Sequence, residues 1–160
     1  MNISEHSRVW VYQANRVLNS SETEAIQQRL DSFTGQWLAH GNELLAKGEI
    51  RYNQFIILSV DEQQAGATGC SIDQSVKLML ELEREFNINL FDRFQLAYRD
   101  GEAIKTSNRQ DFESLIRSGA INPDTIVFNN LVSTRKALET NWEIPMKDSW
   151  HANIFSFNEA

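Results

Sequence analysis

Four stretches of the chain have the apolar pattern of strands, and they predict strands over 8–13, 52–60, 94–99 and 125–132. The first stretch is apolar on both of its faces, which is typical of a strand covered on both sides. The second contains consecutive apolar residues and is predicted to be central in its sheet. Apolar and polar residues alternate in the third, and the Asp100-Gly101 pair that follows it indicates a hairpin.

Apolar residues recur every three or four positions in three other stretches, which predict helices over 21–38, 71–86 and 109–118. Ser21 and Ser71 each precede a Glu or a Gln by three residues, so each is predicted to be the N-cap of a capping box. An asparagine directly before the third stretch and a glycine directly after it are typical of helix caps.

The order of these elements predicts the fold class. A further short helix is expected over 134–141, and the tail after it is expected to be ordered coil with at most one short strand. No repeat and no linker-like segment interrupts the 160 residues, so we predict a single compact α+β domain spanning 1–160, with helices packed on a mixed β-sheet. A ferredoxin-like arrangement of the N-terminal two-thirds is one candidate topology, since strands and helices alternate there.

Composition and charge exclude several classes of partner. The formal net charge is −7 and no dense Lys/Arg run is present, which argues against nucleic-acid binding. The longest apolar run is the four residues 55–58, against the ~20 that a membrane-spanning helix needs, so no membrane insertion is expected. The single cysteine cannot form an intrachain disulfide and the first residues are polar, which together predict a cytoplasmic protein.

The single cysteine, Cys70, is the first candidate for chemistry. It stands between a glycine-containing loop and the predicted start of a helix, where backbone N–H groups favour a thiolate. A thiol-dependent enzyme would use Cys70 as nucleophile with His40 or His151 as base. The alternative is a structural cysteine at a tight loop-to-helix junction, and the sequence favours it because neither histidine lies near Cys70 along the chain.

Phosphate, metal and cofactor sites are poorly supported. Gly66 and Gly69 could form a phosphate loop, but no lysine follows Gly69 and no Walker pattern occurs, so we expect no ATP hydrolysis. An anion at the helix start near Ser71 stays open as an alternative. Three scattered histidines and one cysteine show no ligand spacing, so neither a metal nor a cofactor is expected.

Tryptophan and asparagine supply the remaining candidates. Trp37 lies on the apolar stripe of a predicted helix and is expected in the core, whereas Trp150 in the tail could pack on the domain or form a binding surface. Asn129 and Asn130 interrupt a predicted strand, where asparagine is unusual, and mark a bulge, a hydrogen-bonded corner or a polar site.

Five blocks of the chain resemble the signature segments of an uncharacterised bacterial protein family of about this length, whose members are often labelled "ABC transporter ATPase". The blocks are 7–16, 37–41, 69–73, 124–132 and 149–151, and the resemblance covers nearly the whole chain. It implies no activity and no established site residues, and the label conflicts with the missing Walker loop. The resemblance does single out one set of residues that lie in its blocks: Trp37, His40, Cys70, Asp73, Asn129, Asn130, Trp150 and His151.

The sequence therefore favours a non-enzymatic, cytoplasmic binding or interaction module for a small molecule or a protein. The rival hypotheses are the thiol-dependent enzyme and, by family label alone, a protein associated with an ABC transporter but without ATPase activity. The candidate ligand-binding residues are Trp37, Gly69, Ser71, Asp73, Asn129, Asn130 and Trp150.

Overall fold

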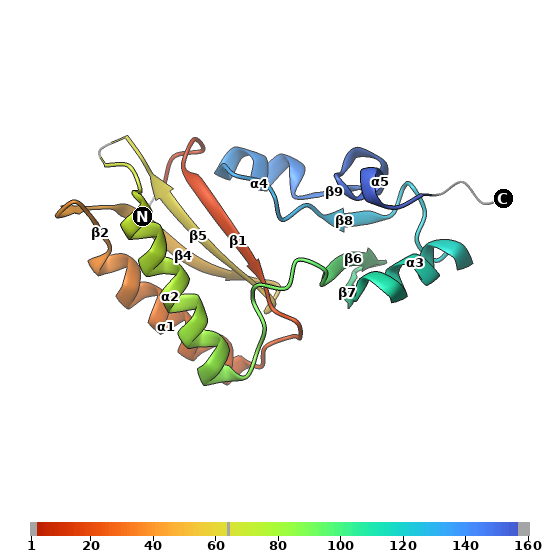
Figure 1. The fold of residues 1–160 in the computed structure, drawn as a ribbon, viewed down its shortest axis with the longest axis horizontal. Coiled ribbons are helices and arrows are strands. Elements are labelled where there is room, and N and C mark those ends of the chain that lie inside the picture. The colour runs from red at the N-terminus through yellow and green to blue at the C-terminus, as the bar shows by residue number, and fades with distance from the viewer. Residues whose placement is uncertain (1–2, 64, 157–160) are drawn as a thin grey trace.

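The computed structural model describes residues 3–63 and 65–156, and its elements form two larger antiparallel sheets and one two-stranded antiparallel sheet, with helices around them (Figure 1). Within these residues the helices are α1 (Ser20–Gln36), α2 (Gly69–Phe86), α3 (Arg109–Ser118), α4 (Arg135–Asn141) and α5 (His151–Ile154), with a 3₁₀ turn η1 (Met146–Asp148). The strands are β1 (Arg8–Gln13), β2 (Leu38–Ala39), β3 (Asn42–Glu43), β4 (Leu45–Arg51), β5 (Phe55–Asp61), β6 (Leu96–Asp100), β7 (Ala103–Ser107), β8 (Ile126–Phe128) and β9 (Glu143–Pro145).

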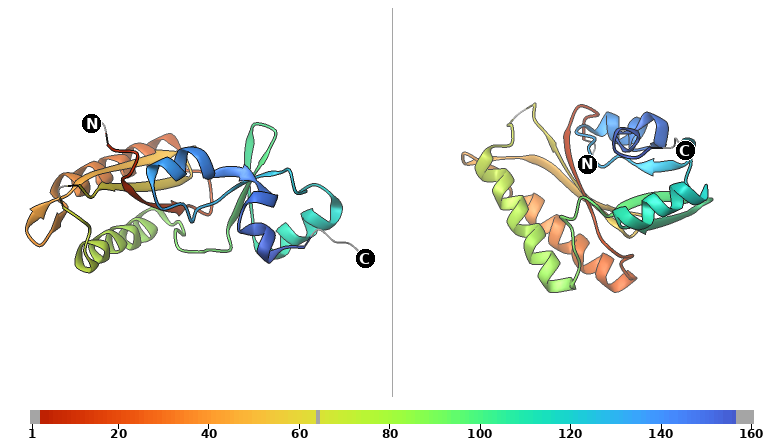
Figure 2. Two further views of the ribbon diagram at one scale, coloured as in Figure 1. Left: turned by 90° about the horizontal axis from the view of Figure 1, so that it is seen from above. Right: turned by 45° about the vertical axis from the view of Figure 1, so that its right-hand side comes forward.

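The first sheet has the order β1-β5-β4, and α1 and α2 cover one of its faces (Figure 2). Every residue of the central strand β5 is buried, because its successive apolar side chains fill a core on each face. On the helical side, Ile56 and Leu58 of β5 pack in one cluster with Leu30 of α1 and Leu82 of α2. This apolar layer fixes the two helices on the sheet.

The opposite face of the first sheet packs against the second sheet, which has the order β7-β6-β8-β9. Phe55 and Ile57 of β5 contact a cluster that includes Phe128 of β8 and Trp142 at the end of α4. Because β5 contributes side chains to both clusters, the two sheets share one continuous interior. A third apolar cluster lies between α3 and the second sheet, around Phe112.

The predicted α+β class is confirmed, and so are the strand over 8–13 and the helix over 109–118 at their expected bounds. Every strand pairing in the described part of the chain is antiparallel, in place of the expected mixed sheet. The first three strand positions match a ferredoxin-like sheet, since β1, β5 and β4 are adjacent in that order. No fourth strand of the first sheet pairs with β1 in the described residues, because the chain after α2 continues into β6 of the second sheet; the loop 133–135 pairs only with the start of β1.

Several local predictions differ from the structure. Strand β4 was not predicted, because its buried positions are the small residues Ala46 and Gly48, which do not give the alternation of large apolar residues typical of a strand. The predicted strand over 52–60 begins only at Phe55, since residues 52 and 53 adopt left-handed turn conformations between β4 and β5. The N-caps of α1 and α2 are Asn19 and Thr68, with φ and ψ of −79° and 171° and of −110° and 170°. The tail forms β9, η1 and α5, and the Asp100-Gly101 hairpin is confirmed.

Gly48 lets α1 approach β4 closely, and its replacement is a test of this packing. A Cβ at position 48 would lie 2.8 Å from the Cβ of Leu30 and 3.4 Å from a methyl group of Leu58. We expect Gly48→Ala to lower the free energy of unfolding by about 1–3 kcal/mol, measured by urea denaturation. Gly35→Ala in α1 is the matched control, because its Cβ meets no atom within 4 Å; it should stabilise the helix by up to about 1 kcal/mol. Equal effects of the two substitutions would contradict this account.

Candidate functional site

Cys70 lies in the first turn of α2 and is exposed. Thr68 and Ser71 form the capping box of this helix, with the Ser71 N–H donating to Thr68 Oγ1 at 3.2 Å and the Thr68 N–H donating to Ser71 Oγ at 2.7 Å. Ser71 is buried, and its carbonyl accepts a hydrogen bond of 2.8 Å from Nε1 of Trp37, which is also buried. The hydrogen bonds of Ser71 and Trp37 therefore stabilise the start of α2, whose first residue is Gly69. Asp73 is exposed on the next turn of this helix.

The two histidines considered as bases lie in different places. His40 is exposed in the turn between β2 and β3, with φ of 51°. His151 is buried at the start of α5, and Figure 1 shows α5 and the N-terminal end of α2 toward opposite ends of the molecule. Across 3–63 and 65–156, no hydrogen bond joins Cys70 to either histidine.

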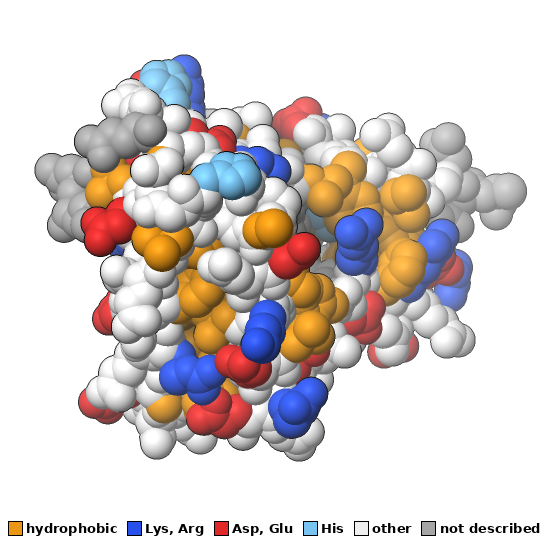
Figure 3. All heavy atoms as spheres, turned by 60° about the vertical axis from the view of Figure 1, so that its left-hand side comes forward, with side chains coloured by type: hydrophobic (Ala, Val, Ile, Leu, Met, Phe, Trp, Pro, Cys, Tyr) orange, Lys and Arg blue, Asp and Glu red, His pale blue; other side chains and the backbone are white. Residues whose placement is uncertain are grey.

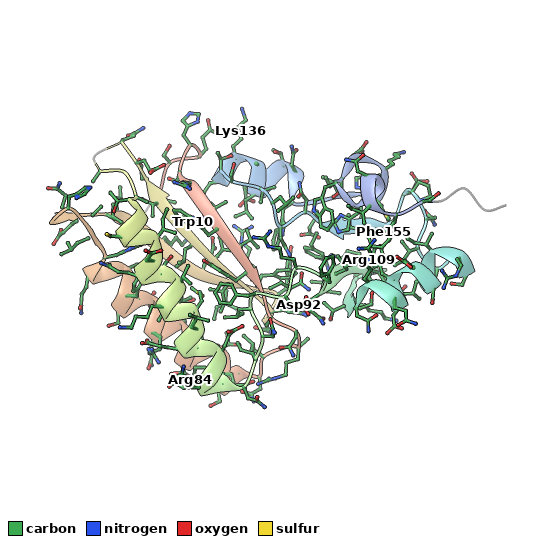
Figure 4. The ribbon with its side chains drawn as sticks, in the orientation of Figure 1. Trp10, Arg84, Asp92, Arg109, Lys136 and Phe155 are labelled. Carbon is green, nitrogen blue, oxygen red and sulfur yellow. The ribbon has the colours of Figure 1, made fainter. Side chains whose placement is uncertain are left out.

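Three other candidates come together in a groove of about 560 Å³ at the junction of the two sheets. Asn130, Trp150 and His151 line it, together with Gln13 and neighbouring residues of β1 and the segment 90–97. Figure 4 shows Asp92, which belongs to this segment, close to the end of β1. We call this feature the junction groove.

A chain of hydrogen bonds in the wall of the junction groove fixes the orientation of two side-chain amides. Trp142 Nε1 can only donate, and it donates to Asn130 Oδ1 at 2.9 Å. The amide nitrogen of Asn130 must then be the other terminal atom, and it donates to Gln13 Oε1 at 2.9 Å. Gln13 Nε2 is therefore the end of the chain, and it is a donor.

Gln13 Nε2 is buried and has no hydrogen-bond partner among the described residues. The Gln13 residue is 6% exposed. A buried donor without an acceptor costs about 1–3 kcal/mol, so such groups are rare in folded proteins and are often explained by function. Trp150 Nε1 is a second buried donor that lacks a partner within the described ranges. Two residues that line the groove, Gln13 and Trp150, thus each have a buried donor without an acceptor in the described part of the chain.

His151 supports the other side of the groove. Its Nδ1 lies 2.7 Å from Ser149 Oγ, and its ring stacks on Trp150 with the centroids 3.9 Å apart. Burial lowers the pKa of His151 to about 4, so the imidazole is neutral at physiological pH. A neutral, buried imidazole that holds a tryptophan in place is a packing group of the site.

The rim of the junction groove is apolar. Phe91, Phe94 and Leu131 line it and are 40%, 55% and 69% exposed. Figure 3 shows hydrophobic side chains gathered around a hollow in the surface of the molecule. Large exposed apolar side chains beside a groove are typical of binding sites. Asp92 and Arg93 add one charge of each sign, so the rim has no strong net charge.

The sequence predicted only part of this site. Asn130, Trp150 and His151 were identified, but Asn129 lies beside the groove as a corner residue, with its backbone N–H donating to the Trp142 carbonyl at 2.7 Å. Gln13 was missed because it ends an apolar strand, where a polar residue is ordinarily exposed. The one available signal was its place on the same strand face as Val9 and Val11.

The chain matches no family model, no curated protein and no solved structure. No helix in the described part of the chain is long and apolar enough to cross a membrane. The described residues also contain no group of three or more His, Cys, Asp or Glu side chains that could hold a metal ion.

Proposed function

We propose that this chain is a non-enzymatic binding module of the cytoplasm and that its ligand occupies the junction groove. The observation that carries the proposal is Gln13 Nε2, an oriented and buried donor of a groove-lining residue, which has no partner among the described residues. A ligand with a carbonyl or carboxylate oxygen would satisfy this donor, and its apolar body would contact Phe91, Phe94 and Leu131. The groove volume of about 560 Å³ lies within the range typical of ligand sites.

This proposal is better supported than a thiol-dependent enzyme. A nucleophilic thiol needs a base within hydrogen-bond reach, and the exposed Cys70 has no such contact with His40 or His151 in the described ranges. In contrast, two of the four buried polar side-chain atoms without a partner in the described residues, those of Gln13 and Trp150, belong to the lining of one groove, together with Asn130 and His151.

Titration with small amides tests the proposal. We expect N-acetyl-leucine amide and N-acetyl-phenylalanine amide, added at millimolar concentration, to shift the NMR signals of the Gln13 side-chain amide and the Trp150 indole N–H. The variant Gln13→Met should bind the same probes at least fivefold more weakly, because about 1–1.5 kcal/mol of hydrogen bonding is lost. Leu80→Ala, at an exposed position of α2 away from the groove residues, is the control and should bind as the unmodified chain does. Unchanged Trp150 and Gln13 signals with every probe would contradict the proposal.

A stability comparison of two buried glutamines separates binding from folding. Gln54 Nε2 donates to the Ala14 carbonyl at 3.1 Å and to Thr106 Oγ1 at 3.3 Å, so Gln54→Met should cost about 1–3 kcal/mol of unfolding free energy. Gln13→Met removes an amide nitrogen that has no partner among the described residues, but it also leaves Asn130 Nδ2 without its acceptor, so its net cost should stay within about 1 kcal/mol. Thermal and urea unfolding of the two variants measure the difference. If Gln13→Met proves the more destabilising change, Gln13 serves the fold rather than a ligand.

A further inference from the structure

Hydrogen bonds along the outer edge of β1 show which of its residues face away from β5. The Val9 N–H donates to the Ser133 carbonyl at 2.9 Å, and the Arg135 N–H donates to the Ser7 carbonyl at 2.9 Å. In an antiparallel ladder, the backbone groups of alternate residues point to opposite edges of the strand. The register between β1 and β5 is continuous, so Val11 and Gln13 also direct their N–H and C=O groups outward.

The outward backbone groups of β1 have hydrogen-bond partners near both ends of the strand, but those in its middle have none among the described residues. Beyond the strand, the Ala14 N–H donates inward to the Gln54 carbonyl at 2.8 Å and the Asn15 N–H donates outward to the Asn89 carbonyl at 3.2 Å, which keeps the same alternation. Between Val9 and Asn15, no hydrogen bond within the described residues uses the outward N–H or C=O groups of Val11 and Gln13.

The open part of this edge coincides with the junction groove. Val11 and Gln13 both line the groove, and β1 is the strand beside the position that a ferredoxin-like sheet would fill with a fourth strand. The chain's own loop 133–135 fills only the half of that position next to the start of β1. The groove occupies the other half.

We propose that the junction groove binds an extended segment of a partner polypeptide, which pairs with β1 at Val11 and Gln13 and completes the fourth strand position. This inference rests on the proposed function and names the class of ligand. Two sets of outward N–H and C=O groups, about 6.6 Å apart along a strand, match a peptide backbone, which repeats its donors and acceptors at that spacing. The free Gln13 Nε2 takes a further carbonyl of the bound segment.

The dimensions of the groove limit the bound segment. Val9 to Asn15 spans roughly 20 Å of extended chain, and both ends are already paired, so about three or four residues of the partner fit. Phe91, Phe94 and Leu131 favour an apolar side chain on the residue beside them. Asp92 and Arg93 disfavour a segment with a high net charge of either sign.

Backbone methylation of a bound peptide tests the pairing directly. Random heptapeptides displayed on phage are selected against the full chain, and a selected sequence is resynthesised with one N-methylated amide at a time. We expect methylation at alternate residues over the central positions to weaken binding at least tenfold, and methylation at the intervening residues to change it less than threefold. Amide hydrogen exchange of Val11 and Gln13 should slow on binding, while that of Trp10 and Tyr12, which face β5, should not change.

Two substitutions on β1 give the protein side of the test. Val11→Pro removes an outward N–H that the sheet does not use and should reduce peptide binding about tenfold, whereas Val11→Ala keeps the N–H and should bind within about threefold. If the proline variant does not fold, the exchange measurement on the unmodified chain decides. The inference is overturned if no peptide can be selected, or if the loss of binding on N-methylation does not alternate along the peptide. It is also overturned if amide hydrogen exchange at Val11 and Gln13 does not change on binding. If the small amides still bind in that case, the proposed function stands and only the peptide inference fails. If neither the small amides nor a peptide binds, the proposed function fails as well.

Discussion

Replacing Trp142 with alanine is expected to lower the free energy of unfolding by about 3–5 kcal/mol. Trp142 is 2% exposed, and its ring centroid lies 5.0 Å from that of Phe55, 5.1 Å from that of Phe128 and 5.7 Å from that of Tyr52. These rings connect the first sheet with the second, so the cavity left by alanine would open where the two sheets meet. Urea denaturation followed by far-ultraviolet circular dichroism measures the loss.

Trp142→Phe separates packing from hydrogen bonding at the same position. Phenylalanine keeps most of the apolar contact but cannot donate to Asn130, so the stability loss should be smaller than that of Trp142→Ala, at about 1–2 kcal/mol. Asn130 would no longer be held in one orientation, and Gln13 would lose its fixed partner. We therefore expect Trp142→Phe to weaken binding in the junction groove, although Trp142 itself is absent from its lining. A loss below about 1 kcal/mol for Trp142→Ala would show that the sheets are held together elsewhere.

The helices and β1 could be predicted because their sequences carry the signal locally. Leu30 and its neighbours on α1 repeat at helical spacing, and Asn108 and Gly119 bracket α3 with the caps that helix ends require. Strand β4 could not be predicted this way, since its inward positions are Ala46 and Gly48. Small residues are needed there because α1 lies directly against them, and that closeness depends on a contact between distant parts of the chain.

The division into two sheets could not be predicted either. Phe55 and Ile56 are adjacent in the sequence and equally apolar, yet one contacts the second sheet and the other contacts α1 and α2. Apolar periodicity indicates that both faces of β5 are covered but not by which element. The junction groove could not be predicted from local periodicity for the same reason, because Gln13 and Asn130 are 117 positions apart and are in contact only in the folded chain. Asn130 was identified as out of place in a strand, and its hydrogen bonds to Trp142 and Gln13 are the physical reason.

Lowering the pH from 7 to 4 is expected to destabilise the fold through His151. Burial lowers the pKa of His151 from its ordinary 6.5 to about 4, so the unfolded chain binds a proton in this range more readily than the folded chain does. Stability that is fully present above pH 6.5 is therefore lost as the pH falls toward 4. The gap between the two pKa values corresponds to a loss on the order of 3 kcal/mol.

Urea denaturation between pH 4 and 7.5 checks this expectation, because it gives the slope of the unfolding free energy against pH for each variant. His151→Phe keeps a ring beside Trp150 and Phe112 but does not titrate, so its unfolding free energy should change much less between pH 6.5 and 4.5 than that of the unmodified chain. His40→Asn is the control variant, because His40 is exposed in the turn between β2 and β3 and does not line the junction groove. Burial raises the pKa of Glu49, but its hydrogen bond to Arg135 and the positive charges around it lower the pKa overall. Protonation of Glu49 therefore causes a further loss of stability at lower pH, where carboxylates take up protons. Because His151 packs on Trp150, protonation should also loosen that side of the junction groove, and peptide binding should weaken over the same pH range. Identical slopes for the unmodified chain and His151→Phe would mean that another group carries the acid sensitivity.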